Sequence, residues 1–248
     1  MARWGRALRL LPPGATRVLD CGCAFGFLTR RLARRHPEVA GIDLDPGYVA
    51  RARHAVPAAD IRLGPVSRLP WPDGHFDAAV CLDVLEHCPD PEAAAAELAR
   101  VLRPGATLVA SVPHAGWLGG ADSLNLYARL RPRADPPTDD PSWELRPHHR
   151  HFTAAELRAV LGPAFEIDTV RTTGLGVAEL LNLPLLLATR GISRRLRPLY
   201  AVLQYAYFGL YVLEDLLPMG LVGYHLTVRA RRRGDGDAAS WRDMRGSA

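Results

Sequence analysis

The chain has 248 residues, 48% of them hydrophobic, and its 31 basic residues stand against 26 acidic ones, a formal net charge of +5. This composition supplies enough apolar material for a folded core and excludes an intrinsically disordered chain. Every basic residue other than histidine is arginine. We expect the basic excess to be spread along the chain, which does not favour a nucleic-acid-binding protein.

Strands and helices alternate through the first 112 residues. Short apolar runs bounded by turn residues resemble buried parallel strands, and helical periodicity follows most of them. Asp45–Pro46 and Asp90–Pro91 each combine a helix-capping residue with a first-turn proline. The predicted elements are a helix over 4–11, strands over 17–21, 39–42, 61–63, 76–82 and 106–112, and helices over 27–35, 48–54 and 91–102.

The regular alternation ends after Pro113. Thr153 and Glu156 form a capping box for a helix that ends at about residue 161. We expect one domain over 1–248. Its parts are a ligand-binding core over about 15–113, an irregular lid over 114–150, late strands over 165–170 and 224–230 flanking an apolar insertion over 175–222, and an unstructured tail from about 232.

The stretch Val18 to Gly26, VLDCGCAFG, takes a buried strand into a glycine loop that opens a helix. In α/β sheets such a loop binds nucleotide-like ligands, because unpaired backbone N–H groups face the crevice there. Gly22 and Gly26 permit a sharp turn, and Asp20 places a carboxylate at the mouth of the loop. A dinucleotide is disfavoured, because Phe27 occupies the place of the third glycine and would collide with the sheet in that binding geometry.

Four segments occur in a characteristic order: VLDCGCAFG, VAGIDLDP, LPWPDGHFDAAVCLDVLEH and RVLRPGATLVASVP. Together they resemble class I S-adenosylmethionine-dependent methyltransferases, close to the ubiquinone-biosynthesis-like (type 11) group, over about 15–115. The later segment HHRHFTAAEL resembles the same family more loosely. The resemblance implies an α/β, Rossmann-like fold with a mostly parallel seven-stranded sheet, helices on both faces and a helical or irregular lid. It also implies S-adenosyl-L-methionine as the cofactor.

The resemblance further assigns residues to the cofactor. It places the glycine loop at the methionine end, the Asp43 carboxylate at the ribose hydroxyls and Leu44 against adenine. The family's third motif, commonly Gly-Asp-Ala, reads Gly64-Pro65-Val66 here, and Ala24 stands where glycine is common, which fits if its φ is negative. The implied cofactor-binding residues are Asp20, Gly22, Cys23, Gly26, Asp43, Leu44, Val66 and Asp83.

Histidines provide the candidates for catalysis. We predict His148, His149 and His87, with His151 in the same cluster, as bases or acceptor contacts, because neutral histidine suits proton transfer near pH 7. D-x-x-E-H at Asp83, Glu86 and His87 resembles the E-x-x-E-H metal motif of some methyltransferases, which His148 or His149 would complete. A metal is not favoured, because Asp83 is shorter than the usual Glu and relatives without metal also carry L-E-H.

The expected reaction is methyl transfer by in-line displacement to a small, apolar or lipid-like acceptor in the cytoplasm. The apolar segment over 175–217 is interrupted by polar residues and too short to span a bilayer, so a packed lid, a peripheral membrane contact and a homodimer surface remain alternatives. A non-catalytic S-adenosylmethionine-binding protein and a metal-assisted O-methyltransferase are the alternative functions.

Overall fold

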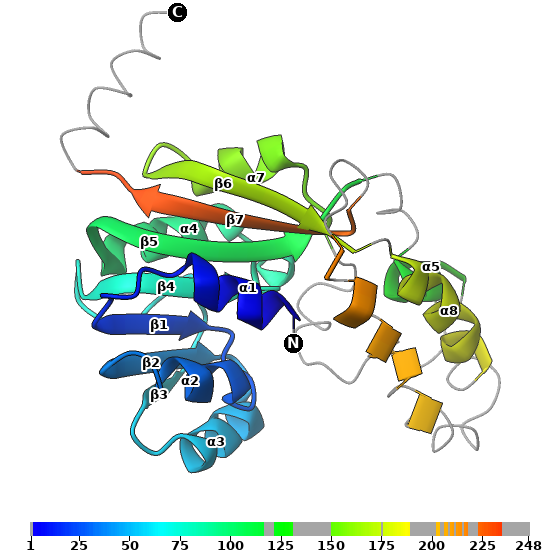
Figure 1. Cartoon of the computed structure of the whole chain (residues 1–248), viewed down its shortest axis with the longest axis horizontal. Helices are drawn as coiled ribbons and strands as arrows, with labels where there is room; N and C mark the ends of the chain where they lie inside the picture. Colours follow the sequence, from blue (N-terminus) through cyan, green and yellow to red (C-terminus); the bar gives the residue numbers. More distant parts are fainter. Residues whose placement is uncertain are drawn as a thin grey trace, which may run out of the picture.

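The computed structural model describes residues 2–116, 122–130, 150–174, 176–188, 202–203, 206–207, 209–210, 212–214, 216–217 and 223–234. Their strands form one seven-stranded sheet in the order β3-β2-β1-β4-β5-β7-β6 (Figure 1). β7 runs antiparallel to both of its neighbours, and the other pairings are parallel. The predicted mostly parallel seven-stranded sheet is therefore confirmed.

The elements lie close to the predicted ranges. The strands are β1 Arg17–Cys21, β2 Glu38–Asp43, β3 Asp60–Leu63, β4 Phe76–Leu82, β5 Leu102–Pro113, β6 Phe165–Thr173 and β7 His225–Arg232. The helices are α1 Ala2–Leu10, α2 Phe27–Leu32, α3 Pro46–Ala55, the 3₁₀ helix η1 Leu85–His87, α4 Pro91–Val101, α5 Ser123–Leu130, α7 Ala154–Leu161 and α8 Val177–Leu186.

Helices cover both faces of the sheet because neighbouring strand residues point to opposite sides. Val18 of β1 packs with Ala7 of α1 and Leu32 of α2 on one face. Leu19, the next residue, packs with Leu98 of α4 on the other face, which α7 also covers. β1 is thus buried on both sides, as its apolar run predicts.

Side-chain caps set the helix starts. Asp45 Oδ1 accepts the Tyr48 N–H at 2.6 Å at the start of α3, and Asp90 Oδ1 accepts the Ala93 N–H at 2.8 Å at the start of α4. Thr153 and Glu156 make both bonds of the predicted capping box at α7. The predicted helix caps are therefore confirmed. Each cap could be predicted from the sequence because it depends only on residues within one helical turn.

The boundary between α4 and β5 differs from the prediction. Leu102 begins β5, where it is fully buried opposite Phe76, and does not end the helix. The pairing then skips to Ala78 and Thr107, so Gly105, with a φ of +79°, lies in an irregular part of the strand. An apolar Leu102 satisfies either pattern, and its strand partner decides between them.

A cap lies beyond the carboxyl ends of the parallel strands, at the right of Figure 1. Its helices α5 and α8 pack together, joined by the buried Glu179, which accepts hydrogen bonds from the Ser123 hydroxyl at 2.5 Å and the Tyr207 hydroxyl at 2.7 Å. Glu214 accepts the N–H groups of Gly176 and Ala178, both at 3.1 Å, at the start of α8. Within the described ranges, none of the helices has the length and apolar character to cross a membrane.

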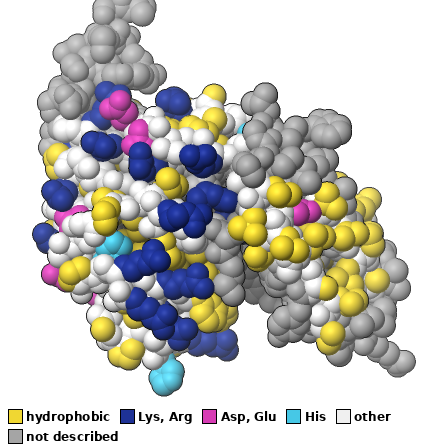
Figure 2. Space-filling view, viewed as in Figure 1, with side chains coloured by type: hydrophobic (Ala, Val, Ile, Leu, Met, Phe, Trp, Pro, Cys, Tyr) yellow, Lys and Arg dark blue, Asp and Glu magenta, His cyan; other side chains and the backbone are white. Residues whose placement is uncertain are grey.

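The basic excess is not spread along the chain. The first 37 residues hold eight arginines and one acid, Asp20, whereas the rest holds 23 basic and 25 acidic residues. Because α1 and α2 cover the same face of the sheet, these arginines gather there, as Figure 2 shows. The expectation of a thinly distributed charge is therefore wrong.

Candidate functional site

A cavity of about 290 Å³ opens at the carboxyl edge of the parallel strands. The loops that follow β1, β2, β3 and β4 form its walls. This edge is where open α/β sheets bind ligands. Of the predicted site residues, the cavity brings together Gly22, Asp43, Leu44, Val66, Asp83 and His87.

Gly22 has a structural reason to be glycine. Its φ is +69°, and a Cβ there would lie 2.4 Å from Cγ2 of Val84, which follows β4. Only a residue without a side chain lets the β1 loop pass this close to the β4 loop. Both loops therefore reach the same cavity wall.

Ala24 differs from the sequence expectation. Its φ is +43°, a left-handed conformation that costs a non-glycine residue energy, whereas the prediction required a negative φ. The Ala24 N–H donates to Asp43 Oδ2 at 2.8 Å, and this bond stabilises the turn. The strain is thus located where the glycine loop meets the end of β2.

Asp43 is held in one orientation at the cavity wall. Besides the bond from Ala24, its Oδ1 accepts the Asp45 N–H at 3.0 Å. Asp45, in turn, provides the N-cap of α3, so Asp43 is not needed for capping. Beside Asp43, Leu44, Pro65 and Val66 give the cavity an apolar wall, with Pro65 in place of a carboxylate.

Asp20 lies beneath the glycine loop and not at its mouth. It is 2% exposed and accepts a hydrogen bond from the Thr29 hydroxyl at 2.6 Å, which joins β1 to α2. Burial, with a smaller contribution from the nearby Asp43 carboxylate, raises the pKa of Asp20 to about 7, although the hydrogen bond from Thr29 acts in the opposite direction. The Cys23 side chain is also buried, among residues that include Val49 and Ile61, and does not line the cavity.

Phe27 faces away from the sheet. It is 55% exposed, and its ring stacks on Trp4 of α1 with 6.2 Å between centroids. The predicted collision with the sheet therefore does not apply to this loop geometry. The case against a dinucleotide depends instead on the missing third glycine itself.

The Asp83 carboxylate is held by an arginine of α1. The Arg3 guanidinium forms an ion pair with Asp83 Oδ2, and the Ser111 hydroxyl donates to Oδ1 at 3.0 Å. The φ of Asp83 is +56°, so the backbone is strained where β4 ends. Arg3 lies 80 residues away in sequence, and no local pattern could have predicted this contact.

The D-x-x-E-H residues do not converge on one point. Asp83 and His87 border the cavity, whereas Glu86 is 2% exposed. Within the part of the chain that the structure describes, no group of three His, Cys, Asp or Glu side chains could hold a metal ion. His148 and His149 lie outside the described residues, so the predicted ligand His148 and both catalytic candidates stay predictions.

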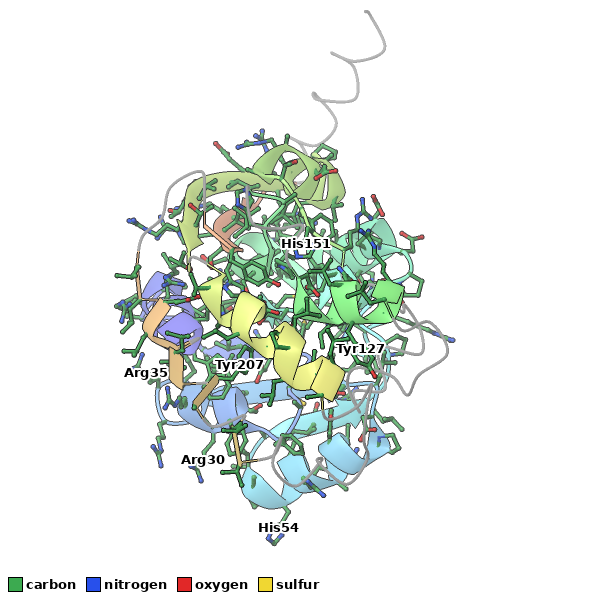
Figure 3. All side chains as sticks on the ribbon, turned by 90° about the vertical axis from the view of Figure 1, so that its right-hand side faces the viewer. Arg30, Arg35, His54, Tyr127, His151 and Tyr207 are labelled. Carbon is green, nitrogen blue, oxygen red and sulfur yellow. The ribbon has the colours of Figure 1, made fainter. Side chains whose placement is uncertain are left out.

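His151 is the described member of the histidine cluster. Its Nε2 lies 3.5 Å from Asp122 Oδ2, which also accepts the Tyr224 hydroxyl at 3.1 Å. Figure 3 shows His151 where the sheet meets the α5–α8 cap. The adjacent His225 is buried, and burial, followed by the charges of Arg3 and Arg6, lowers its pKa well below the usual value. Arg3, whose charge acts on His225, thus also holds Asp83 at the cavity.

Known proteins resemble the chain in sequence and fold. Residues 19–110 match the family model described as "Methyltransferase domain". A "Probable S-adenosylmethionine-dependent methyltransferase" of Mycolicibacterium smegmatis is 36% identical over 167 residues, covering 66% of this chain and 58% of that protein. A "Ubiquinone biosynthesis O-methyltransferase" of Xanthomonas campestris is 43% identical over 110 residues, covering 42% of this chain and 46% of that protein.

The solved structure of the [4+2]-cyclase SpnF has a TM-score of 0.64, with 22% identity, over 94% of this chain and 80% of that one. At this identity the likeness confirms the fold alone. The chain spans less than three fifths of the length of the two curated relatives above.

Proposed function

We propose that this chain, which carries a methyltransferase domain over residues 19–110, transfers a methyl group from S-adenosylmethionine to a small acceptor. The observation that carries the proposal is the cavity at the carboxyl edge, with the Asp43 carboxylate fixed at its wall. The resemblance of the four motifs is confirmed by the family match.

The residues of the cavity fit this cofactor. The β1 loop at Gly22 offers backbone without side chains for the methionine end, and Asp43 accepts hydrogen bonds from the ribose hydroxyls. Leu44 and Val66 supply an apolar surface for adenine. When bound, the sulfonium supplies an activated methyl carbon, and the protein aligns the acceptor and excludes water. Pro65 provides no carboxylate, which predicts weaker binding of the adenine amino group.

The roles of the other predicted cofactor residues follow from their burial. Asp20 supports the loop from beneath, and Gly26, whose Cβ would lie 3.2 Å from Cα of Ala52, lets α2 pack against α3. Asp83, held by Arg3, faces the cavity from the acceptor side. In this assignment Asp20, Cys23 and Gly26 shape the site, and Gly22, Asp43, Leu44, Val66 and Asp83 contact the cofactor.

We infer that His151 is the general base when the acceptor is a hydroxyl. Asp122 lies beside its Nε2 and favours the protonated ring that forms when a proton is taken up. Tyr224 in turn fixes the Asp122 carboxylate. The name of the Xanthomonas relative, an O-methyltransferase of ubiquinone biosynthesis, supports a hydroxyl on an apolar ring as the acceptor.

The apolar cap supports the same class of acceptor. Ala178 and Leu186 of α8 are buried, whereas Leu181 is 60% exposed, so α8 packs as part of a lid and still presents apolar surface. A lid of this kind excludes water from an apolar acceptor.

Titration calorimetry with S-adenosylmethionine tests the cofactor site. Asp43→Asn weakens binding about 10- to 100-fold, because it replaces hydrogen bonds to a charged acceptor by neutral ones. Asp73→Asn is the matched control, since it makes the same replacement in the loop before β4, where the side chain is 80% exposed and does not line the cavity. Absence of binding to the wild type, or equal affinity of the two variants, contradicts the proposal.

Turnover on hydroquinones and phenols separates an enzyme from a non-catalytic binding protein. His151→Gln lowers kcat at least about 100-fold with an unchanged Kd for the cofactor, because only the proton transfer is lost. Raising the pH restores part of the rate, since the acceptor then ionises unaided. His54→Gln, on the exposed end of α3 (Figure 3), is the control. A wild type that binds the cofactor and methylates none of these acceptors favours the non-catalytic alternative.

A further inference from the structure

The arginines of α1, α2 and the turn that follows α2 form a basic surface. Arg9, Arg30, Arg34 and Arg35 are exposed, and no ion pair among the described residues involves them. The guanidinium of Arg31 lies 5.5 Å from the centre of the Trp4 ring. The acid of this part of the chain, Asp20, is buried beneath the loop, so it does not neutralise the surface. Such a surface fits an anionic partner.

An apolar surface lies on the same side of the molecule. We call it the apolar strip; its residues are 40 to 65% exposed and comprise Val202, Leu203, Leu213, Leu216 and Leu217. Figure 2 shows apolar side chains of the cap directly beside arginines. In Figure 3, which is turned by 90°, Tyr207 from this part of the cap lies on the same side as Arg30 and Arg35.

We propose that this face docks on an anionic lipid membrane. Arginines attract the headgroups, and aliphatic side chains beside them insert between the acyl chains, the combination that peripheral membrane proteins use. Nucleic acid fits less well, because its phosphates would face the aliphatic strip, where stacking requires aromatic rings. Of the alternatives for the segment 175–217, the charge of the adjoining surface favours the membrane over a second copy, since two basic faces repel each other.

The docking proposal does not depend on methyl transfer. If the proposed function also holds, the membrane is the place from which the acceptor comes. The reason is that the cavity and the apolar strip both lie at the cap side of the sheet. An apolar acceptor dissolved in the bilayer would then reach the cap without crossing water.

Vesicle sedimentation of the full chain tests the proposal. Vesicles of phosphatidylcholine are compared with vesicles in which about one third of the lipid is phosphatidylglycerol, at low and high salt. The wild type binds the anionic vesicles, and high salt weakens binding. Arg30→Gln with Arg35→Gln weakens it about 10- to 30-fold, from about fivefold for each arginine near the surface.

The matched control is Arg68→Gln with Arg158→Gln, which removes the same charge from the β3 loop and from α7 on the opposite face. It leaves vesicle binding nearly unchanged. Leu213→Ser with Leu216→Ser lowers the binding that persists at high salt, because that part is apolar. Calorimetry with S-adenosylmethionine on every variant, unchanged from the wild type, shows that the fold and the cofactor site are intact.

Three results overturn the proposal. They are equal binding to neutral and anionic vesicles, equal loss in the two arginine pairs, and a single-stranded RNA that displaces the wild type from anionic vesicles at equal phosphate concentration. Each can occur with cofactor binding intact, so the docking proposal can fail while the proposed function stands.

Discussion

Asp20 is the buried acid that ties the first strand to the first helix after the glycine loop. Its pKa of about 7 lies above the ordinary value of 3.8, because burial disfavours the charged form. A pKa that is raised by folding stabilises the protein fully below the unfolded value and loses that contribution as pH rises through the folded value. The stability of the loop therefore depends on pH between the ordinary pKa of an aspartate and the raised pKa of Asp20.

Asp20→Asn is expected to flatten the pH dependence of unfolding. Between about pH 4 and pH 7 the wild type should lose up to about 4 kcal/mol relative to the variant, which keeps an acceptor for the Thr29 hydroxyl. Urea denaturation at a series of pH values measures the difference. Parallel stability curves for the two proteins would show that Asp20 ionises normally.

Sequence patterns at this scale predicted residue types better than conformations. Gly22 and Asp43 could be identified because each follows a buried strand within one motif. The positive φ of Ala24 could not, since the acceptor that stabilises it lies 19 residues further along the chain. The ion pair of Arg3 with Asp83 is still less local, and only the packing of α1 across the sheet brings the two together.

Among the elements, α8 begins in an unusual way. Gly176, its N-cap, offers no side-chain hydrogen bond, and the carboxylate of Glu214 accepts the orphaned N–H groups instead. The negative charge also suits the positive end of the helix dipole. The Glu214 side chain therefore joins the start of α8 to a part of the cap that lies 36 to 38 residues later in the sequence.

Glu214→Ala is expected to loosen the start of α8 and cost about 1 to 3 kcal/mol locally, because it leaves buried N–H groups without an acceptor. Glu214→Gln retains an acceptor oxygen and should lose less. Hydrogen exchange of the amides of residues 176–180 measures the effect. Equal protection in all three proteins would exclude a capping role.

Elements with a local start or a uniform apolar run could be predicted. β4 matches its predicted range of 76–82 because the run from Ala78 to Cys81 is buried and apolar without interruption. The boundary at Leu102 could not be predicted, because an apolar residue there fits both a helix and a strand and its pairing with Phe76 decides. The late strands extend further than predicted, to Thr173 and Arg232, since arginine and threonine at their ends interrupt the apolar pattern.

At the scale of the whole molecule, a ligand that binds only the folded state should raise its stability. S-adenosylhomocysteine at about 100 times its Kd contributes about 2.7 kcal/mol, which raises Tm by about 5 to 10 °C for a chain of this length. Thermal unfolding followed by circular dichroism measures the shift. At the same concentration Asp43→Asn should shift less, and an equal shift would place the ligand elsewhere.

The part of the molecule proposed to bind the acceptor was the least predictable from sequence patterns. Asp122, His151 and Tyr224 come from three separate segments and meet only where the cap joins the sheet. The segment 114–150 indicated a functional lid by its composition, without indicating which of its residues face the reaction. The cavity proposed for the cofactor was accessible because its residues follow parallel strands whose carboxyl ends share one edge.

Because the net positive charge lies in the first 37 residues and the rest of the chain carries a small net negative charge, the molecule has an electric dipole. A charged surface exerts a torque on a dipole at distances beyond contact, up to the Debye length of about 8 Å at physiological salt and further in dilute solution. The protein therefore approaches a negatively charged surface with α1 and α2 facing that surface. The same arrangement accelerates productive encounters, so the rate of association should depend on ionic strength even where the number of contacts formed does not change.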